Sequence, residues 1–343
     1  MRSLRLHTFR CHAELSFELE PGHHVFTGAN GQGKTSLLEA VYFLSRLRSF
    51  RSPHPRELAQ WSEKSWGLDA QTEAVQLGIR WEQGRRELRL DGQAVSLRDF
   101  WGCLRAVLFT NDDRNLVTGS GLARRNWFDG LLAQSDPAYL ELALRYARLL
   151  KQRNAWLKHG AADGGLGEAL TRQLTEAGWQ ITEKRRAVSE EVGRDAENKF
   201  QAICQESLPL VFAYRPNLED AAPDWGRVAE QERRLQQTLL GPHRDDWVLS
   251  RAGHGVGRFG SEGQQRMVAL SLRLAEARII REQRGAWPVF LIDDVTHQLD
   301  IRRQAAFAGL LPAEAQILET TPHRPAAYAG TVWEVKPGRI RKI

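Results

Sequence analysis

Apolar positions near the amino terminus recur at every second residue. They are Leu4, Leu6, Leu15, Phe17 and Leu19. This alternation is typical of half-buried strands, and residues 24–27 read as a third strand that leads into a glycine-rich loop. From Ser36 to Leu47 the apolar spacing changes to a helical one. The start of the chain therefore predicts strands, a loop and a helix in succession.

A second set of alternating segments lies between residues 66 and 110. Its apolar positions are Val75, Leu77, Ile79, Trp81, Leu88 and Leu90. Asp91 and Gly92 suit a tight hairpin turn, and residues 105–109 form another short apolar strand. The alternating segments before residue 105 are expected to belong to an antiparallel β lobe.

The composition becomes helical after about residue 120. One apolar stripe contains Leu166, Leu170, Leu174, Ala177, Ile181, Val188, Val192, Ala196, Phe200 and Ile203. Its spacing places these residues on one side of a long helix that Pro209 closes. A helix over 137–158 is expected to pack against this stripe across a turn at Gly164–Gly165. The pair would form a short antiparallel, coiled-coil-like arm.

Helix and strand patterns return in the last third of the chain. Residues 267–284 and 301–311 are expected as helices, and 289–292 as a buried strand. We therefore expect an α/β fold in three segments. Residues 1–115 and 231–343 would form the two parts of one nucleotide-binding head, and 116–230 the helical arm.

The glycine-rich loop carries the clearest chemistry. The candidate binding residues are Gly28, Ala29, Asn30, Gly31, Gln32, Gly33, Lys34, Thr35 and Ser36. A Gly-x4-Gly-Lys-Thr pattern between a strand and a helix lets successive backbone N–H groups surround phosphates, and the helix start adds partial positive charge. We expect ATP here, with Lys34 on the outer phosphates and Thr35 on Mg²⁺.

Two further segments complete the expected site. The buried strand 289–292 ends in Asp293, a candidate magnesium ligand, and Asp294, a candidate general base. Ser261, Gly263 and Gln264 begin a helix whose amino terminus can receive a phosphate. This segment resembles the signature motif of ABC-type ATPases, which implies that Ser261 completes the ATP site of a second copy in an ATP-dependent homodimer.

Composition narrows the functional class. Hydrophobic residues make up 42% of the chain and charged residues 26%, as in ordinary globular proteins. The three cysteines, Cys11, Cys103 and Cys204, have no spacing that favours a disulfide framework or a zinc site. No apolar run has the length of a membrane-spanning helix. We therefore expect a cytoplasmic protein with no membrane partner.

The net charge of +6 favours an anionic partner. The candidate DNA contacts on the expected helix 137–158 are Arg145, Arg148, Lys151, Arg153 and Lys158. Such a row can hold phosphates of a duplex or a junction without reading sequence, although a basic helix face can also be an ordinary solvated surface. Arg46, Arg48 and Arg51 form a second basic run.

Several separated blocks together resemble the RecF family of recombination-repair ATPases over most of the chain. They are Phe9–Arg10, Gly31–Thr35, Leu37–Ala40, Ser49–Arg51, Arg124–Arg125, Phe128–Asp129, Gly241–Asp246, Ser261, Leu291–Val295 and Leu299–Asp300. The resemblance implies an ABC-type head with a short arm, slow DNA-coupled ATP hydrolysis, and an ATP-gated dimer. It also implies action with RecO and RecR in loading RecA at gapped DNA.

The chain departs from the family pattern at four positions. Cys11 stands where Asn is usual, Asn111 and Gly121 stand where Pro is common, and His297 replaces a serine in the loop after the acidic strand. Thr320 and Thr321 follow a short apolar strand, where related ATPases place a γ-phosphate sensor, and a loop threonine without function is the alternative. An ATP-binding scaffold or another SMC-like ATPase with little turnover is the alternative function. A transporter ATPase subunit is disfavoured by the long separation of Lys34 from Ser261.

Overall fold

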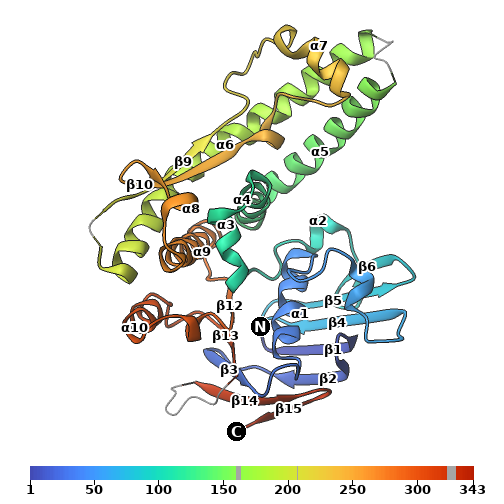
Figure 1. The fold of residues 1–343 in the computed structure, drawn as a ribbon. Coiled ribbons are helices and arrows are strands. Elements are labelled where there is room, and N and C mark those ends of the chain that lie inside the picture. The colour runs from blue at the N-terminus through green and yellow to red at the C-terminus, as the bar shows by residue number, and fades with distance from the viewer. Residues whose placement is uncertain (160–163, 207, 323–329) are drawn as a thin grey trace. The chain divides into compact units, whose positions relative to one another are not determined.

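The computed structural model describes residues 1–159, 164–206, 208–322 and 330–343. It contains two compact units, unit 1 from Met1–Asp113 with Glu276–Ile343, and unit 2 from Arg114–Ala275 (Figure 1). The first boundary lies near the expected one at 115. The second lies at 275 rather than 230, because strand β10 (Asp246–Arg251) pairs with β9 (Leu210–Arg215) inside unit 2.

A six-stranded sheet in unit 1 carries the glycine-rich loop. Its order is β15 (Arg339–Lys342), β14 (Thr331–Lys336), β3 (His23–Thr27), β13 (Ile317–Thr321), β12 (Val289–Asp293) and β8 (Ala106–Phe109). All neighbours are parallel except β14 and β15. Because parallel strands end at the same edge, the residues that follow β3, β12 and β13 meet there.

The second sheet of unit 1 is the expected antiparallel lobe. Its order is β2 (His12–Glu18), β1 (Ser3–Phe9), β4 (Ser65–Gln71), β5 (Gln76–Glu82), β6 (Arg85–Leu90) and β7 (Gln93–Ala94). Asp91 and Gly92 form the two-residue turn between β6 and β7, as predicted from the sequence.

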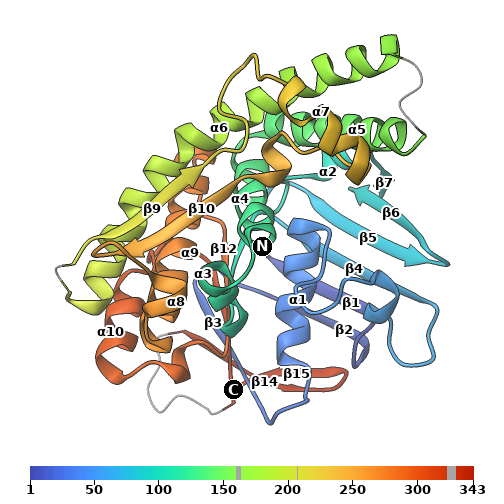
Figure 2. The same cartoon turned by 45° about the horizontal axis from the view of Figure 1, so that its top comes forward.

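Helix α1 (Lys34–Arg46) packs against strands of both sheets in unit 1 (Figures 1 and 2). Most of its residues are buried, and Leu38, Val41 and Phe43 belong to the core that the two sheets share. The helix ends where Leu47 adopts a left-handed conformation and its N–H donates to the carbonyl of Phe43. Unit 1 also contains α2 (Leu97–Phe100), α10 (Ile301–Gly309) and 3₁₀ turns at Pro55–Leu58 and Thr296–Gln298, and a further 3₁₀ turn at Asn111–Arg114 ends at its boundary.

Unit 2 contains the predicted pair of long helices, α5 (Pro137–Lys158) and α6 (Gly164–Cys204), which lie side by side in both views (Figures 1 and 2). Most of the apolar stripe of α6 is buried, but Leu166 is exposed. The expected turn at Gly164–Gly165 was wrong, because both glycines belong to the first turn of α6. The first turn has no internal N–H bonds to lose, which lowers the cost of glycine there.

The other elements of unit 2 are shorter. They are α3 (Asn115–Thr118), α4 (Gly121–Ser135), α7 (Gly226–Leu235), a 3₁₀ turn at Pro242–Arg244, α8 (Val256–Phe259), and the sheet β11-β10-β9, in which β11 is His254–Gly255. Helix α9 (Glu262–Arg284) begins in unit 2 and continues into unit 1. It begins earlier than the predicted 267, because Ser261 caps it.

Two of the sequence blocks that resemble RecF meet around the buried Arg185 of α6. Its guanidinium donates to Asp245 at 2.6 Å, to Asp129 at 2.7 Å and to the carbonyl of Pro242 at 2.7 Å. The Phe128 ring stacks on Trp247 with centroids 4.6 Å apart. These blocks therefore stabilise unit 2, which is a structural reason for their residue types.

The cysteines Cys11, Cys103 and Cys204 are free and partly buried. Within the described ranges, no helix is both long enough and apolar enough to cross a membrane.

Candidate nucleotide-binding site

The glycine-rich loop joins β3 to α1 and requires glycine at two positions. Gly28 has a φ of 148°, and a Cβ there would lie 2.7 Å from the carbonyl oxygen of Val335. Gly33 has a φ of 93°, and its Cβ would collide with the His12 ring and the Cys11 sulfur. A Cβ on Gly31 would instead meet open space. The loop is thus closely packed at Gly28 and Gly33 and open at Gly31, and a loop that binds phosphate needs such an open side.

Lys34 is the first residue of α1, and its side chain folds back over the loop. Its ammonium donates to the carbonyl oxygens of Gly28 at 2.6 Å and Ala29 at 3.0 Å. Burial lowers the pKa of Lys34, and the carboxylates of Asp294 and Asp293 oppose that shift. The site therefore holds a positive charge beside two acidic groups.

Asp293 connects the ends of three structural elements. Its Oδ1 accepts from the hydroxyl of Thr35 at 2.9 Å and from that of Thr320 at 2.8 Å. Burial raises the pKa of Asp293, although these two hydrogen bonds favour the carboxylate. Thr35 lies in the first turn of α1, Asp293 ends β12 and Thr320 lies on β13, so these three elements meet at this edge of the sheet.

Asp294 lies one residue beyond β12 with a φ of 54°, a left-handed conformation that non-glycine residues adopt infrequently. Its Oδ1 is buried and has no hydrogen-bond partner among the described residues. A buried oxygen of this kind needs a donor. A water molecule or a ligand can supply that donor, which is the geometry expected of a group that accepts a proton.

The loop after Asp294 approaches β13 through a residue that departs from the family pattern. His297 is hydrogen-bonded through Nε2 to the hydroxyl of Thr321. Thr296 donates to Glu319 Oε1 at 2.8 Å. Both contacts fix this loop to the strand that carries Thr320.

His12 was not predicted from the sequence as part of the site. It is fully buried, with Nε2 3.3 Å from the carbonyl oxygen of Gly33 and Nδ1 accepting from the N–H of Gly338 at 3.2 Å. The ring is therefore neutral, with the proton on Nε2. Burial lowers its pKa and so favours this form. A histidine at the start of a strand carries no motif, so only the fold reveals its contact with the loop.

An ion-pair group lies on another wall of the site. Arg10 donates from Nε and Nη2 to the two oxygens of the buried Glu39, at 2.8 and 2.6 Å. Arg51 lies 3.6 Å from the same carboxylate and remains half exposed. These residues come from the blocks 9–10, 37–40 and 49–51, so three segments that are separate in the sequence meet at this ion-pair group.

A cavity of about 740 Å³ runs along the loop. The predicted residues that line it are Asn30, Gly31, Gly33, Lys34, Thr35, Ser36 and Asp294. A hydroxyl and a carboxylate 2.9 Å apart, at Thr35 and Asp293, form an all-oxygen donor set of the kind that Mg²⁺ prefers. The described residues contain no cluster of three or more His, Cys, Asp or Glu that would favour another metal.

Ser261 lies in unit 2, at the start of α9, together with Gly263 and Gln264. The Ser261 hydroxyl accepts from the N–H of Gln264 at 3.2 Å, and the Gln264 amide accepts from the N–H of Ser261 at 3.1 Å. This reciprocal pair is a capping box. Ser261 therefore caps α9, and the residue remains exposed.

The basic residues of α5 divide into two groups. Arg148, Lys151 and Lys158 are exposed, and Arg145 lies 3.5 Å from Glu176. Arg153 is buried, pairs with Glu232 at 2.6 Å, and stacks on the Trp225 ring at 4.4 Å. The prediction that Arg153 contacts DNA was therefore wrong, because its guanidinium is already enclosed within unit 2.

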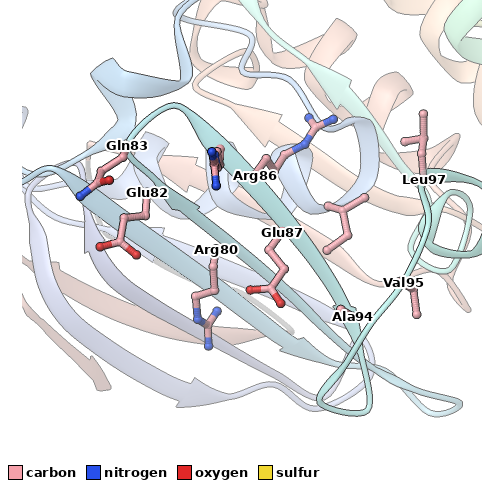
Figure 3. A pocket seen from close by; sticks show the side chains of 10 residues that line it. Arg80, Glu82, Gln83, Arg86, Glu87, Ala94, Val95 and Leu97 are labelled. Atoms are coloured by element: carbon pink, nitrogen blue, oxygen red, sulfur yellow. The ribbon is translucent and has the colours of Figure 1, made fainter.

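Another hollow of about 900 Å³ lies along the β5–β6 hairpin (Figure 3). Arg80 and Arg86 are among the side chains that Figure 3 draws there. Arg80 pairs with Asp69 at 2.8 Å, and Arg86 donates to the carbonyl oxygen of Leu47 at 3.0 Å. The 900 Å³ hollow has neither a glycine loop nor a carboxylate at the end of a parallel strand among its lining residues. It therefore lacks the features that identify the 740 Å³ cavity.

Comparison with known proteins gives a consistent result. The family model described as the RecF/RecN/SMC N terminal domain matches residues 1–329. The chain is 33% identical to a DNA replication and repair protein RecF from Halalkalibacterium halodurans, covering 99% of this chain and 98% of that protein. It is 36% identical to a protein of the same name from a Synechococcus species, covering 94% and 91%.

Solved structures show the same fold. A structure of the recombination mediator protein RecF with ATP in the RecFOR pathway matches with a TM-score of 0.90 at 24% identity, covering 100% of this chain and 97% of that one. An Smc head bound to the C-winged helix domain of ScpA matches with a TM-score of 0.58 at 15% identity, covering 100% and 97%. The predicted fold, an ABC-type head with an antiparallel lobe and a helical arm, is confirmed.

Proposed function

The chain belongs to the RecF family of DNA replication and repair proteins, and from this premise we propose that it is an ATPase that binds DNA as an ATP-gated dimer. The observation that carries the proposal is the meeting of Lys34, Thr35, Asp293 and Asp294 at one edge of the parallel sheet. The solved structure of a related RecF with ATP supports ATP as the nucleotide.

Each residue of the site has a distinct role in this proposal. The backbone N–H groups of the loop 28–33 and the start of α1 bind the phosphates, and Lys34 contacts the outer ones. Asp294 accepts a proton from the attacking water while the bond to the γ-phosphate breaks. Thr320 holds Asp293 in position through its hydroxyl.

Thr35 and Asp293 are the residues that would hold Mg²⁺, because they supply adjacent oxygen donors. The ion would neutralise charge on the phosphate oxygens. The hydroxyl of Thr320 keeps one lone-pair direction of Asp293 occupied and leaves the other oxygen free for that role.

The dimer completes the reaction site in this proposal. The capping box occupies the N–H groups of Ser261 and Gln264, and the N–H groups of Glu262 and Gly263 in the first turn of α9 are directed out of the helix, where they favour an anion. Ser261, Gly263 and Gln264 of one copy would face the terminal phosphate held by Lys34 of the other. A lone copy would then bind ATP but hydrolyse it poorly.

DNA contact is assigned to the exposed part of the α5 row, Arg145, Arg148, Lys151 and Lys158. The related RecF structure belongs to the RecFOR pathway, which supports RecO- and RecR-type proteins as partners and RecA loading at gapped DNA as the outcome. The protein would work in the cytoplasm, and hydrolysis would be slow and coupled to DNA release.

Three variants test the proposal on the purified full-length chain. DNA binding to a gapped duplex, molar mass by light scattering, and phosphate release are measured with and without ATP and Mg²⁺. Lys34→Ala should abolish all ATP-dependent behaviour. Asp294→Asn should keep binding and dimerisation but slow phosphate release by about 100-fold or more. Ser261→Arg should bind ATP and remain monomeric.

Equal DNA binding with and without ATP, unchanged in Lys34→Ala, would refute the ATP-gated model. Wild-type dimerisation by Ser261→Arg would refute the shared site. If wild type dimerised with ATP but released phosphate no faster than Asp294→Asn, the chain would be an ATP-binding scaffold rather than an enzyme.

A further inference from the structure

Trp61 is the most exposed large apolar side chain in the part of the chain that the structure describes, with 94% of its surface accessible. Tryptophan is usually well buried, because it removes more apolar area from water than other side chains do. Trp66, five residues later, is 1% exposed. An indole left in solvent therefore calls for a ligand or a partner that covers it.

The backbone beneath Trp61 is fixed. The N–H of Glu63 donates to the carbonyl of Gln60 at 2.9 Å, and Ser62 has a φ of 70°, so residues 60–63 form a tight turn. The turn is joined to β1, because Gln60 donates to the carbonyl of Thr8 at 2.7 Å and Ala59 bridges to Phe9. The exposed indole thus stands on a backbone tied to the sheet, rather than on a loose loop.

Trp61 lines the same cavity as the glycine-rich loop. The cavity has a catalytic wall, formed by Asp294 and Thr320 from the parallel sheet, and a second wall from the lobe, formed by Arg10, Gln60 and Trp61. The γ-phosphate belongs at the catalytic wall, beside the carboxylates. The remaining wall is the surface available to the sugar and base of a nucleotide.

We propose that Trp61 is the base-stacking platform of the nucleotide site, and that it makes the site select purine nucleoside triphosphates over bare polyphosphate and over pyrimidine nucleotides. This inference rests on the proposed function. A flat indole offers a π face to a base without needing hydrogen bonds, and larger purines overlap it more than pyrimidines do. Covering the ring with adenine also removes the exposed apolar surface from water.

The test separates the base from the phosphates. Dissociation constants for a non-hydrolysable ATP analogue, CTP and inorganic tripolyphosphate are measured by calorimetry on the full-length chain. Trp61→Ala should weaken the affinity for the ATP analogue by about 5- to 100-fold and the affinity for CTP by less. Stacking of a base on an aromatic ring contributes binding free energy on this scale. Tripolyphosphate affinity should stay within about twofold of wild type, and Trp61→Phe should recover most of the loss. Ser62→Ala, in the same turn, is the matched control and should behave as wild type.

The outcomes distinguish this inference from the proposed function. Lys34→Ala should lose affinity for the ATP analogue and for tripolyphosphate together. If wild type bound neither, the proposed function and this inference would both fall. If wild type bound both and Trp61→Ala changed neither, or changed both equally, only the stacking role would be overturned.

One further arm excludes a contact with a second copy. Trp61→Ala is repeated in the Ser261→Arg background, which should stay monomeric. A loss of ATP affinity that persists there supports stacking on the base. A loss that disappears would mean that Trp61 packs against another copy or against DNA, and would overturn the proposal.

Discussion

The phosphate loop depends on a residue outside its own motif. His12 holds the carbonyl of Gly33 and the N–H of Gly338 with its two ring nitrogens, and it fills the space that a side chain at position 33 would need. A loop with several glycines has little intrinsic rigidity, because glycine loses the most conformational freedom on ordering. The neutral, buried imidazole therefore supplies order that the loop sequence lacks.

Replacing this ring should affect stability and binding together. We expect His12→Ala to lower the free energy of unfolding by about 1–3 kcal/mol, because it leaves buried backbone groups without partners. ATP affinity should fall as the loop loosens. His7→Ala is the control, since His7 is exposed and pairs only with exposed Glu14 at 2.8 Å, so the change should stay within about 0.5 kcal/mol. Urea unfolding and ATP titration of both variants test this prediction. Equal losses of stability and ATP affinity in His12→Ala and His7→Ala would contradict the role of His12.

At the level of single residues, the sequence predicts those residues of the candidate nucleotide-binding site that lie in one continuous motif. The loop 28–36 and the Asp293–Asp294 pair carry their chemistry in adjacent positions, so their types and order are enough. His12 and Trp61 carry no local pattern. Their positions depend on how the lobe packs against the loop, which is set by contacts between residues far apart in sequence.

Helix α5 illustrates why a row of like charges is not one functional surface. Arg148 and Arg153 lie on the same helix, but Arg148 is exposed and Arg153 is buried against Glu232. Removing one partner of a buried ion pair is costly because the other charge remains without compensation. The two arginines should therefore respond to substitution in different ways.

We expect Arg148→Ala to change DNA binding but not folding. Its free energy of unfolding should stay within about 0.5 kcal/mol of wild type, while the slope of log K against log salt concentration should lose about 1 unit. Arg153→Ala should instead lower the free energy of unfolding by about 3–5 kcal/mol. Chemical unfolding and salt-dependent anisotropy on one gapped duplex measure both. A large loss of stability in Arg148→Ala, or none in Arg153→Ala, would contradict this division.

At the level of elements, long periodic segments were predictable and short ones were not. The 137–158 helix coincides with α5, because a 22-residue amphipathic pattern leaves little ambiguity. β9 and β10 were not predicted. They are six residues each, and Val211 and Val248 on them are exposed, so the alternation does not separate an inner from an outer face. The boundary expected at 230 falls between these two paired strands, and the compact unit that contains them extends to Ala275.

The whole molecule carries buried neutral histidines in both units. Burial lowers the pKa of His12 and of His24 in unit 1, and that of His243 in unit 2 to about 4. His243 is hydrogen-bonded to the Tyr146 hydroxyl at 2.7 Å and to the carbonyl of Thr238 at 3.1 Å. In the unfolded chain each would titrate near 6.5. The unfolded state therefore binds protons that the folded state resists.

The stability of the protein should consequently fall as pH drops below about 6.5. The contribution of His243 is fully present above that pH and is lost progressively toward its folded pKa of about 4. Between pH 7 and pH 5, a range above most carboxyl titrations, we expect about 2 kcal/mol of loss from this residue. Urea unfolding across that range, on wild type and His243→Gln, tests it. The variant should show the shallower pH dependence, and equal slopes would contradict the assignment.

The strand order of unit 1 has a consequence for synthesis of the protein. The phosphate-binding strand β3 is flanked by β13 and β14, which leave the ribosome almost a whole chain later. Until then β3 has neither of its hydrogen-bonded neighbours, and its apolar residues stay exposed. Pairing between strands that are far apart in sequence is slow, and the exposed strand makes the nascent chain prone to aggregation. A chain that ended before residue 317 would contain the complete glycine loop sequence but neither of the strands that pair with β3.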